Sequence, residues 1–374
     1  MMDELIAFAE ITKLNILFLR KQEIFYNDKI NLLREKGINI IYSESCKNIT
    51  FAKLYFCLLF TIKHLKCFIN LHSFVYGIKS LWYFLKTDLK IFKKEQINLH
   101  CQFATQSSIL GLMLKEYFKT DVSYSFTFHA YDIFVKNLWF NLLTANAEKV
   151  FSISNFNINY ILKHYKINDN SKVNFSPLGV FTPKNIKTDK SSDVLRIGFI
   201  SYFVEMKGID YLLPAIRELK KTDLSFMLNI AGDGPLKKKM ISYIDKNNLK
   251  GNVKFHGLIK NEEKDLFFRN LEVFILPSIS NGIATDGLPV VLMEAVSYGL
   301  PIISTNISGI PEICINDYNG YLIEQKSVEE IVNAIVRFSK NSSKWSDFSR
   351  NSLEISRKYD ITINSARKLK MLGW

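Results

Sequence analysis

The stretch D-G-L-P-V-V-L-M-E, residues 286–294, decides the fold of the second half of this 374-residue chain. It lies between two short apolar segments, Val273–Leu276 and Pro301–Ser304, which have the length and composition of buried strands. Pro289 suits the first turn of a helix, and Gly299 suits its end. The pattern therefore predicts a strand, a helix and a second strand in succession.

Glu294 is an unusual residue for that helix. The other polar residues between the proline and the glycine are Ser297 and Tyr298, so we expect the helix to be buried. A carboxylate inside a buried helix is costly unless something hydrogen-bonds it. No lysine or arginine lies within a helical turn on either side, so the partner comes from elsewhere in the fold or from a ligand. Ribose and other polyhydroxylated ligands suit a fixed carboxylate.

The rest of the second half alternates between strand and helix patterns. The expected strands are 195–200, 226–231 and 253–255, and the expected helices are 209–221, 236–247, 261–269 and 328–338, the last with Ser327 and Glu330 as a capping box. This alternation predicts an α/β fold with a doubly wound, mostly parallel sheet. In such sheets ligands bind beyond the carboxyl ends of the strands.

The first half is less regular, and a polar stretch, 184–193, separates it from the second. The expected strands are 14–19, 38–42, 99–103, 123–128 and 150–153, and the expected helices are 24–36, most of 51–95, and a segment capped by Ser154 that runs to His164. We therefore expect an N-terminal domain over 1–185, a linker at 186–193, a C-terminal domain over 194–345, and a helical tail at 346–374 that packs back on the N-terminal domain.

Composition favours a folded cytoplasmic protein. Hydrophobic residues make up 48% of the chain, which supports two full cores and argues against disorder. The five cysteines include no C-x-x-C pair, so we expect neither a disulfide framework nor a zinc site. The first ten residues, M-M-D-E-L-I-A-F-A-E, are acidic and lack the basic start of a signal peptide.

The net charge of +13 is concentrated in part of the first half. Residues 51–100 hold eight Lys and Arg against two acidic residues, together with many Phe, Tyr, Leu and Ile. Their uncharged runs are too short to span a bilayer. Lysines interleaved with large apolar residues fit a surface that lies on anionic lipid. The alternative is a helical region with solvated lysines. We expect no nucleic-acid partner, because no nucleic-acid motif accompanies the charge.

Four loops of the second half follow the ends of predicted strands. They are S-Y-F-V-E-M-K-G at 201–208, G-D-G-P at 232–235, the long connection 277–288, and I-S-G-I-P at 307–311. Helix N-termini and glycine-rich turns favour phosphate, and Lys207 adds a positive charge. Together the four loops predict a pocket for a ligand that carries a diphosphate.

Seven short motifs follow one another in this region. They are K-G at 207–208, A-G-D-G-P-L at 231–236, V-K-F-H-G at 253–257, V-F-I-L-P-S at 273–278, D-G-L-P-V-V-L-M-E-A at 286–295, G-L-P-I-I-S-T at 299–305 and G-I-P-E at 309–312. By their order and spacing, residues 195–338 resemble the retaining GT-B glycosyltransferases that carry an E-x7-E motif, glycosyltransferase family four.

The first half resembles the same family more weakly. H-C-Q-F-A at 100–104 and S-F-T-F-H-A-Y-D-I at 125–133 look like two of its stretches, and E-I-F-Y-N at 23–27 is similar to the start of transferases that build exported bacterial polysaccharides. The resemblance implies a GT-B fold, with two Rossmann-like doubly wound domains facing a cleft. It also implies transfer of a sugar, with retention of configuration, from a nucleotide-sugar to a glycan or lipid-linked acceptor of lipopolysaccharide or capsule type.

The resemblance further implies roles for individual residues. Glu294 would hold the ribose of the donor, Asp286 the donor sugar, and Lys207 the diphosphate as it leaves. His129 would hydrogen-bond the donor sugar near its reacting carbon. The other implied donor-binding positions are Tyr202, Gly232, Gly234, Pro235, Gly257, Gly287, Leu288, Pro289, Val290 and Val291. No D-x-D triplet occurs, which fits a site that needs neither a metal nor another cofactor.

Two positions depart from the family pattern. Tyr202 stands where the family usually has an Arg that pairs with Lys207, and Asp286 stands where it usually has Glu. Loss of one hydrogen bond to a charged group, worth roughly 1.5–3 kcal/mol, weakens donor binding about tenfold to a hundredfold. Two alternatives therefore stay open: a nucleotide-sugar-binding homologue with impaired catalysis, and an epimerase or phosphorylase of the same fold.

Overall fold

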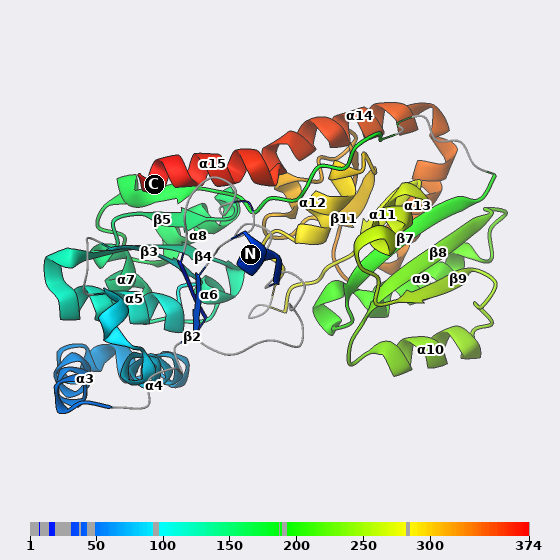
Figure 1. Ribbon diagram of the computed structural model, residues 1–374. Helices are drawn as coiled ribbons and strands as arrows, with labels where there is room; N and C mark the ends of the chain where they lie inside the picture. The colour runs from blue at the N-terminus through cyan, green and yellow to red at the C-terminus, as the bar shows by residue number, and fades with distance from the viewer. Residues whose placement is uncertain are drawn as a thin grey trace. The chain divides into compact units, whose positions relative to one another are not determined.

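The chain forms two compact α/β units, which Figure 1 draws in one view. The computed structural model describes residues 7, 15–18, 31–36, 39–42, 49–92, 97–186, 188, 193–281 and 285–373. The first unit comprises Met1–Leu178 and Thr362–Trp374, and the second comprises Gly179–Ile361. The chain thus leaves the first unit after Leu178 and returns to it at Thr362. The sequence analysis placed the linker at 186–193 and the tail, expected to pack back on the N-terminal domain, at 346–374.

The second unit is built on a six-stranded parallel sheet with the order β12-β11-β10-β7-β8-β9. Its strands are β7 (Leu195–Tyr202), β8 (Phe226–Asp233), β9 (Val253–Gly257), β10 (Val273–Leu276), β11 (Ile302–Thr305) and β12 (Gly320–Ile323). The chain winds outward from β7 in one direction and then, from β10, in the other. The order therefore reverses between β7 and β10, which is where doubly wound sheets bind ligands.

Helices connect these strands or follow the last of them. They are η6 (Glu205–Lys207), α9 (Ile209–Leu219), α10 (Lys237–Lys246), α11 (Asn261–Arg269), α12 (Val290–Ser297), η7 (Ile310–Glu312), α13 (Val328–Lys340), η8 (Ser342–Lys344), α14 (Trp345–Ser356) and η9 (Arg357–Tyr359). The Ser327 half of the predicted capping box of α13 is confirmed, because the Glu330 N–H donates to Ser327 Oγ at 3.1 Å.

The first unit contains a four-stranded parallel sheet in sequential order and a separate parallel pair. The four strands are β3 (Ile97–Gln102), β4 (Val122–Phe128), β5 (Val150–Ser152) and β6 (Val173–Phe175), and the pair is β1 (Asn15–Phe18) with β2 (Asn39–Tyr42). Its helices include α3 (Phe51–Lys63), η2 (Leu65–Phe68), α4 (Leu71–Lys86), η3 (Leu89–Phe92), α5 (Gln106–Phe118), η4 (Lys119–Asp121), α6 (Ala130–Phe134), α7 (Phe140–Asn146), α8 (Asn155–His164), η5 (Asn170–Lys172) and α15 (Ile361–Leu372).

Aromatic side chains fill much of the core of the first unit. Trp139 is fully buried, its ring lies parallel to that of Phe60, and its indole N–H donates to the Ser73 carbonyl at 2.8 Å. The predicted cap at Ser154 is confirmed by a hydrogen bond of 3.1 Å from the Asn157 N–H. Several expectations lie outside the described residues, namely helix positions 24–30, the motif at 23–27, and linker positions 187 and 189–192.

Gly208 allows two loops of the second unit to meet. It lies between η6 and α9 with a φ of +72°, a backbone conformation that L-residues with side chains rarely adopt. A Cβ atom here would lie 1.7 Å from the carbonyl oxygen of Pro277, in the loop after β10. Nearby, the Ile279 N–H donates to the Met206 carbonyl at 2.9 Å. A residue without Cβ is therefore required where the loops after β7 and β10 touch.

We predict that Gly208→Ala destabilises the second unit by about 1–3 kcal/mol, because the backbone must leave its conformation and the Pro277 carbonyl must move. Gly251→Ala is the matched control, since a Cβ there meets nothing within 4 Å. Thermal unfolding of both variants measures the effect. Equal midpoints for the two variants would contradict the close approach.

Asp132 joins the loops that follow β3 and β4 in the first unit. Its Oδ2 accepts the backbone N–H groups of Ala104 and His129, each at 2.9 Å. The side chain is 2% exposed, and Oδ1 has no hydrogen-bond partner among the described residues. Burial raises the pKa of Asp132 from 3.8 to about 7, although the two N–H donors act in the opposite direction. The carboxyl therefore ionises more readily in the unfolded chain than in the folded one.

We predict that Asp132 makes folding stability fall as the pH rises from about 4 to about 7. Over that range the unfolded chain releases the proton that the folded chain keeps. Asp132→Asn removes this titration, so the stability advantage of the wild type over the variant should shrink by up to roughly 4 kcal/mol across the range. Urea unfolding of both proteins at several pH values measures it, and a pH-independent difference would contradict the prediction.

Candidate active site

Lys207 and Asp286 meet at the point where the strand order of the second unit reverses. Lys207 ends η6, just after β7, and Asp286 lies in the connection that follows β10. The Lys207 ammonium contacts Asp286 Oδ1 at 2.6 Å and Oδ2 at 2.8 Å. The two side chains are 17% and 13% exposed. The parallel sheet thus brings together two of the predicted site residues, which lie 79 positions apart in the sequence.

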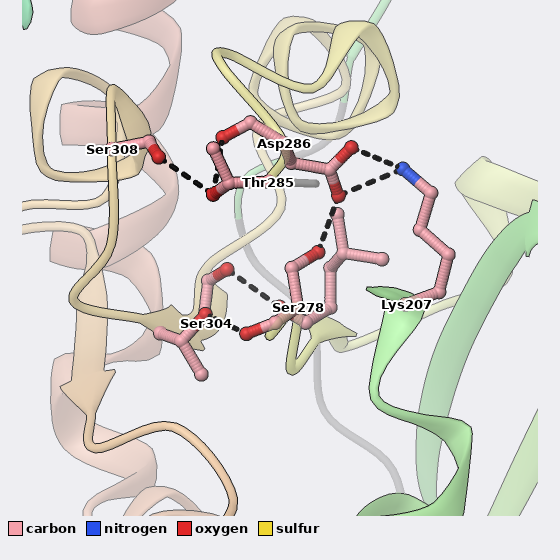
Figure 2. A network of polar contacts seen from close by, with 8 residues as sticks. Lys207, Ser278, Thr285, Asp286, Ser304 and Ser308 are labelled. Carbon is pink, nitrogen blue, oxygen red and sulfur yellow. Dashed lines mark hydrogen bonds and ion pairs between the residues drawn. The ribbon is translucent and has the colours of Figure 1, made fainter. Parts of the chain in front are cut away.

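Neighbouring loops fix the position of Asp286. Ser278 Oγ donates to Asp286 Oδ2 at 2.6 Å, so the carboxylate lies between a hydroxyl and the ammonium, as Figure 2 shows. The Gly287 carbonyl accepts the Gly309 N–H at 2.7 Å, and the hydroxyls of Thr285 and Ser308 lie 2.8 Å apart. These bonds connect two of the loops predicted to surround the ligand.

Glu294 lies on the more exposed side of α12. Val290, Val291 and Glu294 share this side at helical spacing, while Leu292, Met293 and Ala295–Ser297 are buried. Lys264, on α11, places its ammonium 2.6 Å from Glu294 Oε1. The carboxylate therefore has the partner from elsewhere in the fold that the sequence required. No sequence signal singled out Lys264, because it lies 30 positions away on another helix.

The remaining predicted positions of this unit follow the same edge of the sheet. Tyr202 ends β7, and its side chain is 64% exposed. Gly232 and Gly234 have φ values of +128° and +156°. A Cβ on Gly232 would collide with the Ser201 carbonyl in β7, and one on Gly234 with the backbone of Phe203, just after β7. Gly257 ends β9 with a φ of +69°. Pro235 is exposed, whereas Gly287, Leu288 and Pro289 are buried ahead of α12.

His129 belongs to the first unit, where it caps the N-terminus of α6. Its Nε2 lies 3.5 Å from Gln102 Oε1, and its ring lies 4.3 Å from that of Phe103, centroid to centroid. Asp132, which fixes the backbone of this loop, was not among the predicted site residues, although its place three residues after the cap is typical of a capping box. The role that the resemblance implies for His129 in donor binding stays a prediction.

His100 has a structural environment. Its ring nitrogens lie 2.8 Å from Ser125 Oγ and 2.9 Å from Thr127 Oγ1, both on the neighbouring strand β4. Burial, and secondarily the charge of Lys368, lower the pKa of His100 well below its usual value. His100 is therefore a neutral side chain that links two strands.

The described residues lack two further features. No group of three or more His, Cys, Asp or Glu side chains within those ranges is arranged to hold a metal ion. No helix in the described part of the chain has the length and apolar character needed to cross a membrane.

Comparison with known proteins identifies the domain that carries the lysine and the two acids. Residues 182–354 match the family model described as "Glycosyl transferases group 1". An uncharacterized glycosyltransferase of Methanocaldococcus jannaschii is 26% identical over 291 residues, which cover 76% of this chain and 77% of that protein. WcaL of Escherichia coli, a putative colanic acid biosynthesis glycosyltransferase, is 30% identical over 174 residues, which cover 45% of this chain and 42% of WcaL.

Solved structures match 99% or more of the chain, among them a glycosyltransferase of Rickettsia africae. HepE of Anabaena, in complex with UDP and glucose, has a TM-score of 0.69 and 14% identity, and the match covers 100% of this chain and 95% of HepE. At this identity the likeness establishes the fold alone. The two α/β units with parallel sheets and the match to GT-B structures establish the fold, and the family model identifies the type of domain in the second unit. The chain has the GT-B fold, and residues 182–354 match the group 1 glycosyltransferase family model.

Proposed function

We propose that the protein transfers a sugar from a nucleotide-sugar donor, with retention of configuration, to a glycan or lipid-linked acceptor of a cell-surface polysaccharide. The observation that carries this proposal is the meeting of Lys207 and Asp286 at the reversal point of the sheet, within a group 1 glycosyltransferase domain. A cation and a carboxylate at that edge match the two parts of such a donor, the diphosphate and the sugar hydroxyls.

The cation would act on the leaving group. As the bond between sugar and diphosphate breaks, negative charge grows on the diphosphate oxygens, and the Lys207 ammonium lowers the energy of that state. Backbone N–H groups at the start of α12, around Val290 and Val291, add a second positive potential. Because these groups supply the charge stabilisation, we propose that the reaction needs no metal ion and no other cofactor. Positioning of donor and acceptor supplies the rest of the rate acceleration.

The two carboxylates would position the donor. Glu294 accepts hydrogen bonds from the ribose hydroxyls, while Lys264 on Oε1 orients the carboxylate. Asp286, held by Ser278, accepts hydroxyls of the sugar. On binding, the diphosphate competes with Asp286 for the Lys207 ammonium. The ammonium, which is already paired with Asp286, then interacts with both anions.

Relatives suggest the donor nucleotide and the acceptor class. UDP and glucose are bound in the HepE structure, and the name of WcaL assigns it to colanic acid biosynthesis. We therefore propose UDP as the first nucleotide to test. We also propose a cytoplasmic location, because a nucleotide-sugar donor is supplied there and a lipid-linked acceptor lies at the inner face of the membrane.

Tyr202 supports a second candidate, a binding protein with impaired catalysis. An exposed phenol stands where the resemblance implies an arginine, so the diphosphate loses one cation. Calorimetric binding of UDP without transfer, across a panel of nucleotide-sugars with lipid extracts as acceptor, would favour this candidate. If nuclear magnetic resonance shows that the donor is converted in the absence of acceptor, the protein would instead be an epimerase.

We predict that Glu294→Gln lowers the rate of sugar transfer at least about a hundredfold, because an uncharged amide binds ribose hydroxyls less strongly and leaves the Lys264 charge unpaired. Release of the nucleoside diphosphate from a panel of donors measures the rate, with circular dichroism to verify the fold. Glu329→Gln, on the exposed surface of α13, is the matched control. Full activity in Glu294→Gln would remove the ribose-binding role.

We predict opposite effects on UDP binding for the two partners of the ion pair. Lys207→Met should weaken binding about tenfold to a hundredfold, because the diphosphate loses its cation. Asp286→Asn should leave UDP affinity equal or greater, because the competing carboxylate is gone, and yet should reduce transfer. Calorimetry with UDP measures both, with Lys238→Met on the exposed side of α10 as control. Equal losses in the two site variants would show that the pair acts only as a structural contact.

A further inference from the structure

Helix α3 carries apolar side chains on the face that points to solvent. Its buried residues are Lys53, Cys57 and Phe60, which define the inner face. The exposed residues on the opposite face follow helical spacing and are Phe51, Leu54, Tyr55, Leu58, Leu59 and Ile62. A helix on the surface of a soluble protein normally presents polar residues there. Phe51 is 82% exposed, Leu58 57% and Ile62 63%.

The apolar surface continues through η2 into α4. Leu65, Ile69, Leu71, Phe74, Ile78 and Trp82 are also exposed, and the last three lie at helical spacing along α4. The inner face of α4 includes Gly77, Tyr83 and Phe84, which are buried. In Figure 1 the two helices lie next to each other at the margin of the first unit. We call the exposed apolar residues of both helices and their connection the outer face.

The outer face is basic as well as apolar. Residues 49–87 contain five lysines and no Asp or Glu. Lys53 is buried, where its ammonium donates to the carbonyls of Leu85 and Thr87, and Lys63 pairs with Glu116 at 3.0 Å. The other three, Lys66, Lys79 and Lys86, flank the outer face, and the Lys86 ammonium lies 4.9 Å from the centre of the Trp82 ring.

We propose that the outer face is a membrane-binding surface that lies on anionic lipid. Large exposed apolar patches mark interaction sites, and this one has the composition of interfacial helices, with Leu, Ile, Phe and Trp on one side and lysine at the margins. Lysines interact with anionic headgroups while the apolar side chains enter the boundary with the acyl chains. Helices of 13 and 16 residues lie in that plane and do not cross it.

The composition favours lipid over a protein partner. Protein interfaces are depleted in lysine, and their hot spots are enriched in Trp, Tyr and Arg and poor in Leu. The outer face has no arginine, and Leu and Ile supply most of its apolar residues. The inference goes beyond the proposed reaction, because this surface binds a membrane whichever sugar the second unit transfers.

Flotation of the full chain with vesicles tests the proposal. We expect binding to mixed phosphatidylglycerol and phosphatidylcholine vesicles at low salt, and weaker binding to phosphatidylcholine alone. Leu58→Glu and Ile62→Glu should each reduce binding about tenfold. Lys66→Gln should reduce it about fivefold on anionic vesicles and leave it unchanged on neutral ones. Ile241→Glu, at an exposed position of α10, is the matched control.

Three outcomes would overturn the proposal. The first is no flotation of the wild type with anionic vesicles. The second is equal binding by Leu58→Glu and Ile241→Glu, which would place the lipid contact elsewhere. The third, from sedimentation of the same variants, is a wild-type dimer that Leu58→Glu converts to monomer while vesicle binding is unchanged, since a second copy would then cover the outer face. Circular dichroism spectra matching the wild type verify that the exposed substitutions leave the fold intact.

Discussion

The ion pair between Lys207 and Asp286 is the interaction around which the second unit arranges its ligand-binding edge. Both charges are largely removed from water, and such charges are tolerated only when paired and further hydrogen-bonded. Ser278 supplies the further bond, and Gly208 allows the two loops to approach closely enough for the pair to form. The pair therefore constrains the loops after β7 and β10 together.

A second lysine and acid, Lys264 and Glu294, repeat this arrangement on helices α11 and α12. In both pairs the acid is the residue expected to accept hydroxyl groups, and a carboxylate has acceptor capacity beyond one ammonium. A ligand that carries hydroxyl groups and a diphosphate can therefore bind while each lysine and each acid of the two pairs keeps a partner. On this physical ground we propose that a site with two such ion pairs suits a nucleotide-sugar.

The proposed role of the outer face of α3 and α4 is to keep the protein at the membrane. A growing surface glycan carried on lipid stays at the membrane, so an enzyme that extends it gains from residence there. Neither helix can cross the bilayer, and each carries its apolar stripe on the side away from the core. Lipid contact and donor chemistry are assigned to separate units, and each assignment can be tested without the other.

The sequence alone determined the α/β class, the parallel sheet of the second half, the caps at Ser154 and Ser327, and the loops that carry Lys207 and Asp286. It could do so because hydrophobic periodicity, helix caps and turns each depend on residues that are close together in the sequence. Tertiary structure decided that Lys264 faces Glu294, that Ser278 and Lys207 share Asp286, and that Asp132 joins two loops. These contacts depend on which strands become neighbours and on how the helices pack. Residues far apart in the sequence come close only when their segments bury apolar faces against each other.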